Sequence, residues 1–444
     1  MDWQHSVRCP WMRQQQIRLA ITQLVLGLRW NQMYCADPGH WHQRQAGWLV
    51  NRLVELGPTF IKLGQLLSTR VDLLPLEYIY AFQTLPGWMP PMKAATAIAC
   101  IEAELGASVG LLYRTFEPAP IAADCLGQVH RATLSRGEPV VVKIQRPEVE
   151  PLLHLDLAIL RQLIPGMQSC FQGKSPCNLA DLFEELAHRL SQGINWIQTG
   201  LNADRLRHNF RDTPVVWVPQ IYPSYTTKRI LTMEYAPGIT ITDYLRFEKG
   251  GFERSVLQPL SIYCYLKQVL QDGFFQINLT PNKLAVSQDS RLILYGFSDV
   301  AELSPLQRSH LIRALFELQQ QDGGGTLRSL VNGGLLKPDI PPALMRQIMQ
   351  VIVRYLHQGQ PAQRSFRQVQ AEVYQIFQQR PFCLANHTLW MLQGLACLDQ
   401  ISQSLDPGTN LLQISRPLMA SQPTPHGLIQ YMDILKKITK GIFS

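Results

Sequence analysis

The chain has 444 residues, of which 46% are hydrophobic and 17% are charged, so it is a globular protein long enough for two or three lobes. Its formal net charge of +8 favours acidic partners such as nucleotide phosphates or anionic lipid headgroups. No nucleic-acid-binding motif accompanies this charge, so nucleic acid is not expected as a partner. The nine cysteines have no C-x-x-C spacing, which argues against a zinc site and for a reducing compartment such as the cytoplasm.

The first part of the chain, residues 1–110, is predicted to be a helical extension because its apolar residues recur at spacings of three and four. Its apolar run Leu19–Leu28 is too short to cross a bilayer. We expect neither a transmembrane helix nor a signal peptide. Arg8, Arg13 and Arg18 precede the run, so it fits either a helix on a membrane surface or one packed on the protein's own core. Peripheral attachment to a membrane therefore stays open.

The second part, residues 111–237, is predicted to be a small lobe with a mixed sheet. β-branched runs bounded by Gly, Pro or Asp predict strands at Val140–Ile144, Val215–Tyr222 and Arg229–Tyr235. A helix is expected to begin near Asn178, which is a favourable N-cap residue.

The third part, residues 238–444, is predicted to be a helical lobe. One interruption is expected, a hairpin of Leu284–Val286 and Leu292–Tyr295 around Ser287–Ser290.

Five segments of the chain share the order of known kinase-like motifs. They are GPTFIKLGQLLSTR (Gly57–Arg70), PIAADCLGQVH (Pro120–His130), VVKIQRP (Val141–Pro147), LTMEYAPGITITD (Leu231–Asp243) and DGFF (Asp272–Phe275), followed by a fainter tail at Leu395–Leu412. In this order they resemble the UbiB/AarF family of atypical kinases from about residue 50 to residue 300. Chance agreement of five ordered motifs is negligible, so the chain is identified as a member of this family.

The resemblance implies an α+β, protein-kinase-like bilobal fold with an N-terminal helical extension carrying the K-x-G-Q motif. It also implies adenine nucleotide, ATP or ADP, as the ligand. The expected partners are an anionic membrane surface or proteins of isoprenoid-quinone and prenyl-lipid biosynthesis, since the family is linked to that metabolism at membranes.

Site residues follow from the resemblance position by position. The K-x-G-Q residues are Lys62, Gly64 and Gln65, expected to reach into the cleft. The nucleotide-binding positions are the strand lysine Lys143, the phosphate-covering loop residues Ala122, Ala123 and Gly127, and the hinge residues Met233, Glu234 and Tyr235.

The chain departs from the family pattern where the chemistry would take place. The E-x-D motif of the small-lobe helix is replaced by Gly193 and Asn195, and the catalytic acid of the H-A-D loop by Asn278. The metal-binding positions hold Lys283 and, in place of the D-F-G aspartate, Gly296. In the loop over the phosphates, Asp124 and Cys125 replace an alanine and a serine.

These exchanges predict a catalytically impaired protein, a pseudokinase acting as a scaffold or regulator. Mg²⁺ requires oxygen ligands, which a glycine and a lysine side chain do not offer, so Mg²⁺ is not expected. Phosphoryl transfer also needs an acid or base at the nucleophile, and Asn278 cannot accept a proton at neutral pH.

Three alternatives stay open at this point. The first is an active kinase or ATPase that uses Asp299, Asp124 or the pair Glu184/Glu185 as substitute carboxylates. The second is a peripheral membrane protein that binds lipid. The third concerns nucleotide binding. Either Lys143, Lys62 and Lys283 form a metal-free anion site, or the cleft is closed and Lys143 pairs with Glu184 or Glu185.

Overall fold

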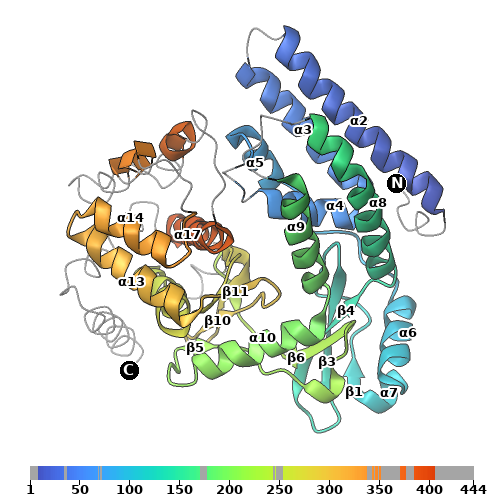
Figure 1. Ribbon diagram of the computed structural model, residues 1–444. Helices are drawn as coiled ribbons and strands as arrows, with labels where there is room; N and C mark the ends of the chain where they lie inside the picture. Colours follow the sequence, from blue (N-terminus) through green and yellow to red (C-terminus); the bar gives the residue numbers. More distant parts are fainter. Residues whose placement is uncertain are drawn as a thin grey trace. The chain divides into compact units, whose positions relative to one another are not determined.

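The computed structural model describes residues 9–34, 38–68, 70, 73–170, 178–243, 246, 254–337, 343–344, 346–348, 350–351, 371–376 and 385–405. The chain forms two compact units, Met1–Gly200 with Ile221–Tyr235 and Leu201–Gln220 with Ala236–Ser444. Each unit combines helices with short strands (Figure 1), which confirms the predicted α+β class. The division into parts 1–110, 111–237 and 238–444 stays a prediction, and residues of the first two parts occur together in the first unit.

The amino-terminal part of the first unit is helical, as predicted. Its helices are α2 (Pro10–Tyr34), α3 (Pro38–Leu56), α4 (Pro58–Leu67), α5 (Leu76–Gln83), α6 (Ala94–Leu105) and α7 (Val109–Leu112). Between the sheet strands β4 and β6 the chain forms α8 (Val149–Cys170) and α9 (Leu179–Gly193), and then α10 (Trp196–Asn209), which runs from the first unit into the second. Among the described residues, none of the helices is both long and apolar enough to cross a membrane.

Helix α2 contains the apolar run Leu19–Leu28. The sequence left open whether this run lies on a membrane surface or packs on the protein's own core. Its residues Arg13 and Ile17 are buried against the core of the unit. On its other side, Trp11, Met12, Leu19 and Leu26 are between 53% and 68% exposed. The helix therefore packs on the protein's own core and still presents a second apolar face.

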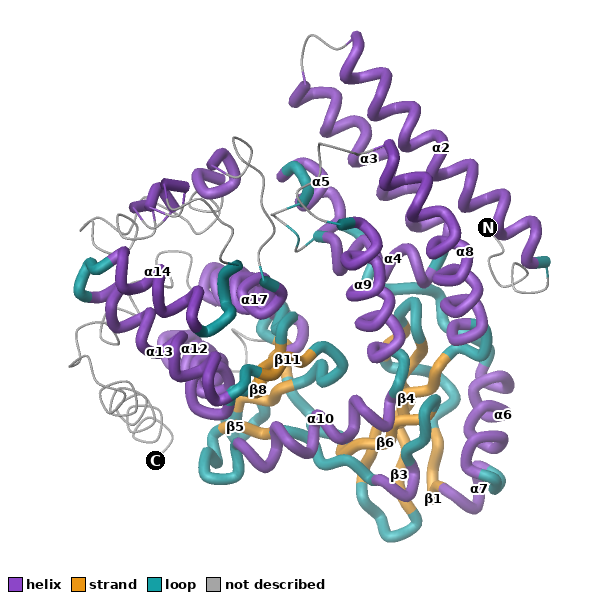
Figure 2. The backbone as a smooth tube through the Cα atoms, in the orientation of Figure 1, coloured by secondary structure: helices purple, strands orange, loops and turns teal. Residues whose placement is uncertain are grey.

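The sheet of the first unit is antiparallel, with the strand order β1-β3-β4-β6. The prediction of a mixed sheet was wrong, because the composition of strands does not give the direction in which they pair. Its strands β1 (Tyr113–Phe116), β3 (Gly127–Leu134), β4 (Pro139–Gln145) and β6 (Ile230–Glu234) are labelled in Figure 2. The short strand β2 (Ala122–Ala123) pairs with β3. Strand side chains alternate between the two faces, so Val140, Val142 and Ile144 all lie on one face. There they pack, fully buried, with Ala97 and Ile101 of α6.

Two of the three predicted strands are confirmed, and the third is largely wrong. Val140–Ile144 lies within β4 and Arg229–Tyr235 contains β6. Of Val215–Tyr222, only β5 (Val216–Trp217) is a strand, and it belongs to the second unit, where it pairs with β10. Pro219 has no N–H to donate to a ladder, so a continuous strand ends before it.

The helix predicted to begin near Asn178 is confirmed. The side-chain oxygen of Asn178 accepts a hydrogen bond from the amide of Ala180 at 3.0 Å, and α9 starts at Leu179. The cap satisfies one of the amide groups that have no partner within the first turn of a helix.

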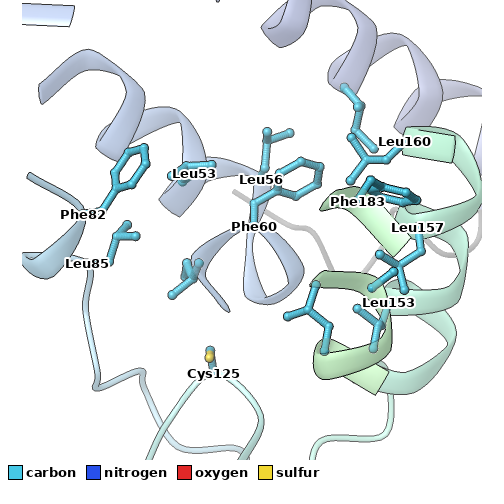
Figure 3. Close-up of a cluster of buried hydrophobic side chains, with 14 of the residues drawn as sticks. Leu53, Leu56, Phe60, Phe82, Leu85, Cys125, Leu153, Leu157, Leu160 and Phe183 are labelled. Atoms are coloured by element: carbon cyan, nitrogen blue, oxygen red, sulfur yellow. The ribbon is translucent and has the colours of Figure 1, made fainter. Parts of the chain in front are cut away.

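The extension and the helices α8 and α9 share one hydrophobic core (Figure 3). Figure 3 shows Phe60 of α4 between Leu56 and the α8–α9 side chains, with Cys125 approaching from the loop before β3. Inside this helical layer the side chain of Arg13 forms a bidentate ion pair with Asp156 of α8 at 2.6 and 2.7 Å. Both side chains are 1% exposed or less. This ion pair fastens α2 to α8.

Replacing Arg13 by Met is expected to lower the free energy of unfolding of the first unit by about 3–5 kcal/mol, because Asp156 would keep a buried charge without its cation. The matched control is R161M, since Arg161 makes the same two-pronged contact to Glu184, but both side chains are 55% exposed. That change should cost about 0–1 kcal/mol. Denaturant unfolding followed by circular dichroism gives both values, and equal losses would contradict the role of burial.

The second unit consists of short strands and longer helices. Its further elements are β7 (Ile239–Thr240), α12 (Arg254–Leu266), the π-helical turn η2 (Lys267–Asp272), β8 (Phe274–Gln276), the 3-10 turn η3 (Pro281–Lys283), β9 (Leu284–Val286), β10 (Leu292–Leu294), β11 (Val300–Glu302), α13 (Pro305–Gln319), α14 (Gly323–Asn332) and α17 (Asn386–Leu405). The strands form one sheet in the order β5-β10-β9-β7 and a second ladder of β11 with β8.

The predicted hairpin is confirmed as the antiparallel pair β9–β10. Leu284 lies opposite Leu294, and the amide of Tyr295 donates to the main-chain oxygen of Lys283 at 2.9 Å. This register brings Lys283, just before β9, next to Gly296, just after β10. Of the fainter tail, residues 395–405 belong to α17, and residues 406–412 lie outside the described part of the chain.

Candidate functional site

Strand β4 places Lys143 on the sheet face opposite α6. Lys143 lies between Val129 of β3 and Leu231 of β6 in the ladder, and Val141 is paired with Met233. Directly opposed residues of an antiparallel pair share a face, as do residues two apart on one strand. The strand lysine and the predicted hinge residue Met233 therefore lie on the same face of the sheet.

The partner of Lys143 is Asp124, and not Glu184 or Glu185 as one of the alternatives expected. The Lys143 Nζ atom is 3.8 Å from Asp124 Oδ2 and lies 5.0 Å from the centre of the Trp196 ring. Glu184 pairs with Arg161, and Glu185 is 3.5 Å from Arg70. The predicted pairing was wrong because the carboxylate of Asp124, in the loop between β2 and β3, lies beside the ammonium group.

Asp124 holds its own loop together. Its Oδ1 atom accepts hydrogen bonds from the amides of Leu126 at 2.7 Å and Gly127 at 2.8 Å. Burial by itself would raise the pKa of this carboxyl, but the charges of Lys143 and Lys62 and the two amide donors outweigh it and hold the pKa below its ordinary value of 3.8. Asp124 is therefore an anion at neutral pH, with Lys62 of the K-x-G-Q motif near enough to influence its charge.

The K-x-G-Q segment lies on α4. Gly64 is buried, and a Cβ atom there would meet the end of the Leu85 side chain and would lie 2.8 Å from Leu53 Cδ1. The main-chain oxygen of Gln65 accepts from the Ser68 hydroxyl. Gly64 thus permits close packing of α4 inside the extension, which is a structural reason for one of the three motif residues.

The predicted phosphate-covering positions lie on β2 and at the start of β3, the strand that pairs with β4. Ala122 is exposed and Ala123 is buried in β2, which pairs with β3. Gly127 has no room for a side chain, since a Cβ atom would lie 2.9 Å from the Trp196 ring and closer still to the Ile144 oxygen.

The predicted hinge residues lie at the end of β6, the last strand in the sheet order. Met233 and Glu234 are half-buried, and the Tyr235 amide donates to the Pro139 oxygen at 3.0 Å. The Arg131 guanidinium lies 4.7 Å from the centre of the Tyr235 ring. These contacts hold the hinge residues against β3 and β4.

Two residues near Lys143 were missed by the sequence reading. Trp196, 1% exposed, opens α10 beside Lys143 and Gly127. Arg146, just after β4, donates to the main-chain oxygens of Asp124 at 3.1 Å and Pro90 at 2.6 Å. The sequence offered one signal for each residue. Trp196 directly follows Asn195, and Arg146 lies three residues after the strand lysine Lys143.

Gly193 and Asn195, which replace the acidic residues of the E-x-D motif, offer no negative charge to Lys143. Gly193 is the last residue of α9, and Asn195 lies between α9 and α10, where its side-chain oxygen accepts from the Gln198 amide at 3.4 Å. Asn195 acts as an N-terminal cap for α10.

In the second unit, Lys283 fills the space beside Gly296. Gly296 has a φ of +80°, and a Cβ atom there would lie 3.0 Å from Lys283 Cε, 3.2 Å from Cγ and closer still to Cδ. The Lys283 Nζ atom donates to the main-chain oxygen of Asn278 at 2.8 Å. Lys283 thus contacts both Asn278 and Gly296, two further positions at which the chain departs from the kinase pattern.

Neighbouring groups fix this arrangement. The side-chain amide of Gln276 donates to the main-chain oxygens of Tyr295 at 2.8 Å and Gly296 at 3.1 Å. Cys397 of α17 lies 3.9 Å from the Asn278 side-chain oxygen, and burial raises the pKa of its thiol to about 11 although Lys283 lowers it. Helix α17 therefore packs on the segment that carries Asn278.

A magnesium ion does not fit these positions. Among the described residues there is no group of three or more His, Cys, Asp or Glu side chains placed to hold a metal ion. Asp299 lies in the bend before β11, and its main-chain oxygen accepts from the Ile277 amide at 3.0 Å. Asp272 of the DGFF segment forms an ion pair with Lys267 inside η2, at 2.8 Å. At the predicted metal positions the ion would meet an ammonium group and a glycine.

Taken together, an antiparallel sheet with an inward strand lysine and a helical unit with a hairpin between two loop segments define a protein-kinase-like fold. The model of the ABC1 atypical kinase-like domain matches residues 85–329, so the chain belongs to this family, and its resemblance to UbiB/AarF proteins is confirmed.

The relatives agree with this assignment. An uncharacterized protein of Synechocystis sp. is 37% identical over 428 residues, which cover 95% of this chain and 75% of that protein. The chloroplastic protein ACTIVITY OF BC1 COMPLEX KINASE 7 of Arabidopsis thaliana is 34% identical, over 84% of this chain and 54% of its own length. The chain thus spans about half the length of this plant relative.

A solved structure shares the fold. The structure of Rv3197 from Mycobacterium tuberculosis, described as a complex with erythromycin, has a TM-score of 0.56 at 18% identity, over 74% of this chain and 83% of that one.

The lowered pKa of Asp124 predicts how its contribution to stability depends on pH. A carboxyl group with a lower pKa in the folded protein contributes stability above its ordinary pKa and loses it as the pH falls through that value towards the lowered one. The wild type should therefore exceed D124N in free energy of unfolding at neutral pH, and the difference should shrink as the pH falls below 3.8. Urea titrations of both proteins between neutral and acid pH measure it, and a difference independent of pH would contradict the ion pair.

Proposed function

We propose that this chain is a catalytically impaired member of the ABC1 family, a pseudokinase that acts as a scaffold or regulator. The observation that carries the proposal is the Lys283 side chain, which lies against Gly296 and donates to the main-chain oxygen of Asn278. Phosphoryl transfer needs metal ions that neutralise developing charge and an acid or base at the nucleophile. A fixed ammonium group beside a glycine, with an amide at the acid position, supplies neither.

The losses at these positions act on different parts of the reaction. General acid–base catalysis contributes about 10²–10⁴-fold to a rate, and Asn278 cannot supply it. The metal contribution is a separate one, because it comes from charge neutralisation at the phosphate. Two of the candidate substitute carboxylates have cationic partners of their own, Glu184 with Arg161 and Asp124 with Lys143, which supports the proposal.

The biological setting of the proposal is isoprenoid-quinone or prenyl-lipid metabolism. It rests on the resemblance to UbiB/AarF proteins, whose family is linked to that metabolism. The name of the Arabidopsis relative refers to the activity of the bc1 complex and to the chloroplast, which concerns that protein and supports a role near electron-transport membranes.

Binding of ATP or ADP without a metal is part of the proposal. Lys143 is exposed on one quarter of its side chain (26%), and Lys62 acts on the same carboxylate. These two ammonium groups would supply the positive charge for the phosphates.

Thermal unfolding with ATP, with and without Mg²⁺, tests the loss of the metal site. The wild type should show no Mg²⁺-dependent stabilisation and no ATP turnover. The triple variant N278D/K283N/G296D should gain Mg²⁺-dependent stabilisation, which amounts to about 2.7 kcal/mol for a ligand at a hundred times its Kd. The strain of a side chain at φ +80° lowers stability with and without Mg²⁺ alike, so the difference between the two measurements still reports binding.

The matched control is N278D/G296D, which should gain nothing. With Lys283 in place, the new side chain at position 296 would collide with its methylene groups, and the ammonium group would repel a cation. Mg²⁺-dependent stabilisation or turnover in the wild type would contradict the proposal and favour an active kinase or ATPase with substitute carboxylates.

A second candidate function, attachment to a lipid surface, is favoured by α2. Met12, Leu19 and Leu26 are exposed at intervals of seven residues, so they line one face of the helix. Trp11 and Arg18 are exposed nearby. An exposed apolar face with an aromatic and a basic residue is typical of helices that lie in a membrane interface.

Flotation of the full chain with anionic vesicles at low salt tests this candidate. The wild type should float, and L19S/L26S should lose at least half of the floating fraction because the buried apolar area falls. The control is L111S, since Leu111 is 76% exposed but lies on α7. Absence of flotation in the wild type, or an equal loss in the control, would dismiss attachment through α2.

A further inference from the structure

A proline-rich strap (residues 86–92, PGWMPPM) joins α5 to α6 and is bonded to the strands β2 and β3. The amide of Met89 donates to the Ala123 oxygen of β2 at 3.3 Å. The Arg146 side chain donates to the Pro90 oxygen at 2.6 Å. The three prolines of the strap have no amide donors, so its position depends on a small number of hydrogen bonds.

The third anchor of the strap is the side-chain amide of Gln128 in β3. Its Oε1 atom accepts from the Met92 amide at 2.8 Å, and its Nε2 atom donates to the Met92 oxygen at 3.4 Å. These two bonds fix which end of the amide group is the donor. The same Nε2 atom lies 2.7 Å from Nε2 of His130. Because the amide nitrogen only donates, the Nε2 atom of His130 must accept and carries no proton.

The second ring nitrogen of His130 completes this chain of bonds. In a neutral imidazole with an unprotonated Nε2 atom, the proton is on Nδ1, which donates to the Glu117 main-chain oxygen at 2.8 Å. Phe116 stacks on the ring, with the centroids 4.9 Å apart. Gln128 is 1% exposed and His130 is 0% exposed. The structure thus accommodates one neutral tautomer of a fully buried histidine.

The elements packed around His130 present apolar or uncharged side chains to it. Strand β4 places Val142 opposite His130. The titratable groups packed on this side of the sheet are a thiol and phenols, namely Cys100, Tyr113, Tyr222 and Tyr225. Glu102 and Glu104 of α6 accept hydrogen bonds from other groups. The remaining charged residues of the adjoining segments are exposed, namely Lys93, Arg114, Glu117 and Arg131. None of these groups offers a buried carboxylate to a protonated His130.

Protonation of His130 conflicts with the third anchor of the strap. An Nε2–H group would point at the Gln128 nitrogen, which is itself a donor. Turning the Gln128 amide around would satisfy the imidazolium, but its nitrogen would then face the amide of Met92. Either arrangement leaves a buried polar group without its bond, which is costly. Burial lowers the pKa of His130 below its ordinary value of 6.5, so below that pH an opened strap takes up a proton that the closed strap does not.

We propose that His130 is a pH-sensitive switch for the strap, whose neutral form holds the strap on β2 and β3 and whose protonation releases it. The proton comes from solvent and binds at Nε2, where it replaces the bond from Gln128. Falling pH therefore favours release. A released strap gives up its contacts to Ala123 and Arg146, which adjoin the loop between β2 and β3. The switch depends on neither a nucleotide nor the proposed function.

Hydrogen–deuterium exchange of the full chain at about pH 7.5 and about pH 5.5, on the two sides of the ordinary histidine pKa, tests the proposal. The amides of Met89 and Met92 report on the strap, and their protection factors are corrected for the intrinsic pH dependence of exchange. In the wild type these factors should fall about three- to tenfold at the lower pH, the upper value being the limit for a proton bound only by the opened strap. Those of Val140–Ile144 in β4 should change by less than about twofold.

Two variants and a control make the test specific. H130Q keeps an acceptor for Gln128 but binds no proton, so its strap should be equally protected at both pH values. Q128E places a carboxylate beside His130 and favours the imidazolium, so protection should rise as the pH falls. The control is H154Q, since His154 is exposed on α8; it should keep the pH dependence of the wild type.

Equal protection of the strap at both pH values in the wild type would overturn the proposal, and so would an unchanged pH dependence in H130Q. An equal fall in β4 would also overturn it, because His130 would then act on the whole unit. Should H130Q not fold, Q128E decides the matter, since a fall in protection like that of the wild type would refute the switch.

Discussion

The contact between the Asp124 carboxylate and the Lys143 ammonium is the interaction around which the loop between β2 and β3 is arranged. An inward-facing strand lysine is costly unless a negative charge compensates it. The helix positions that would bear acids in a UbiB/AarF-like protein hold Gly193 and Asn195, so the charge must come from elsewhere. The loop between β2 and β3 supplies it, at 3.8 Å. The same carboxylate accepts from two amides of its loop, so one side chain both stabilises the loop and pairs with the lysine.

In the second unit, too, a charged side chain of the protein occupies the site, but here its charge is positive. Where a metal cation would lie in a kinase-like site, the Lys283 side chain lies against Gly296 and bonds to Asn278. A glycine is needed there because a side chain at position 296 would collide with the lysine, and because the backbone adopts φ +80°. In each unit a side chain of the protein thus occupies the site. It is the carboxylate of Asp124 in the first unit and the ammonium group of Lys283 in the second. This supports a stable fold that does not need a bound ligand to balance its charges.

Much of the fold could be predicted because its signals are local. Alternating and β-branched residues placed β4, β6 and the β9–β10 hairpin, and the capping side chain of Asn178 placed the start of α9. The segment Val215–Tyr222 was misread because the composition of a strand says nothing of its ladder partner. Val216 and Trp217 pair with β10 in the second unit, while Ile221 bridges to Met233 in the first.

The sequence by itself determined the family, through five ordered motifs. It also determined the exchange of the catalytic acid at Asn278 and of the metal-binding residues at Lys283 and Gly296, because residue identity alone decides which chemistry a position can offer. Only the tertiary structure decided what those residues touch. Lys143 meets Asp124 rather than Glu184 or Glu185, because the pairing of β2, β3 and β4 brings a loop 19 residues away to the ammonium. Lys283 meets Gly296 because the hairpin register sets them side by side. The sequence gives the charge of each side chain, but the distances between charged side chains are fixed only when the strands pair.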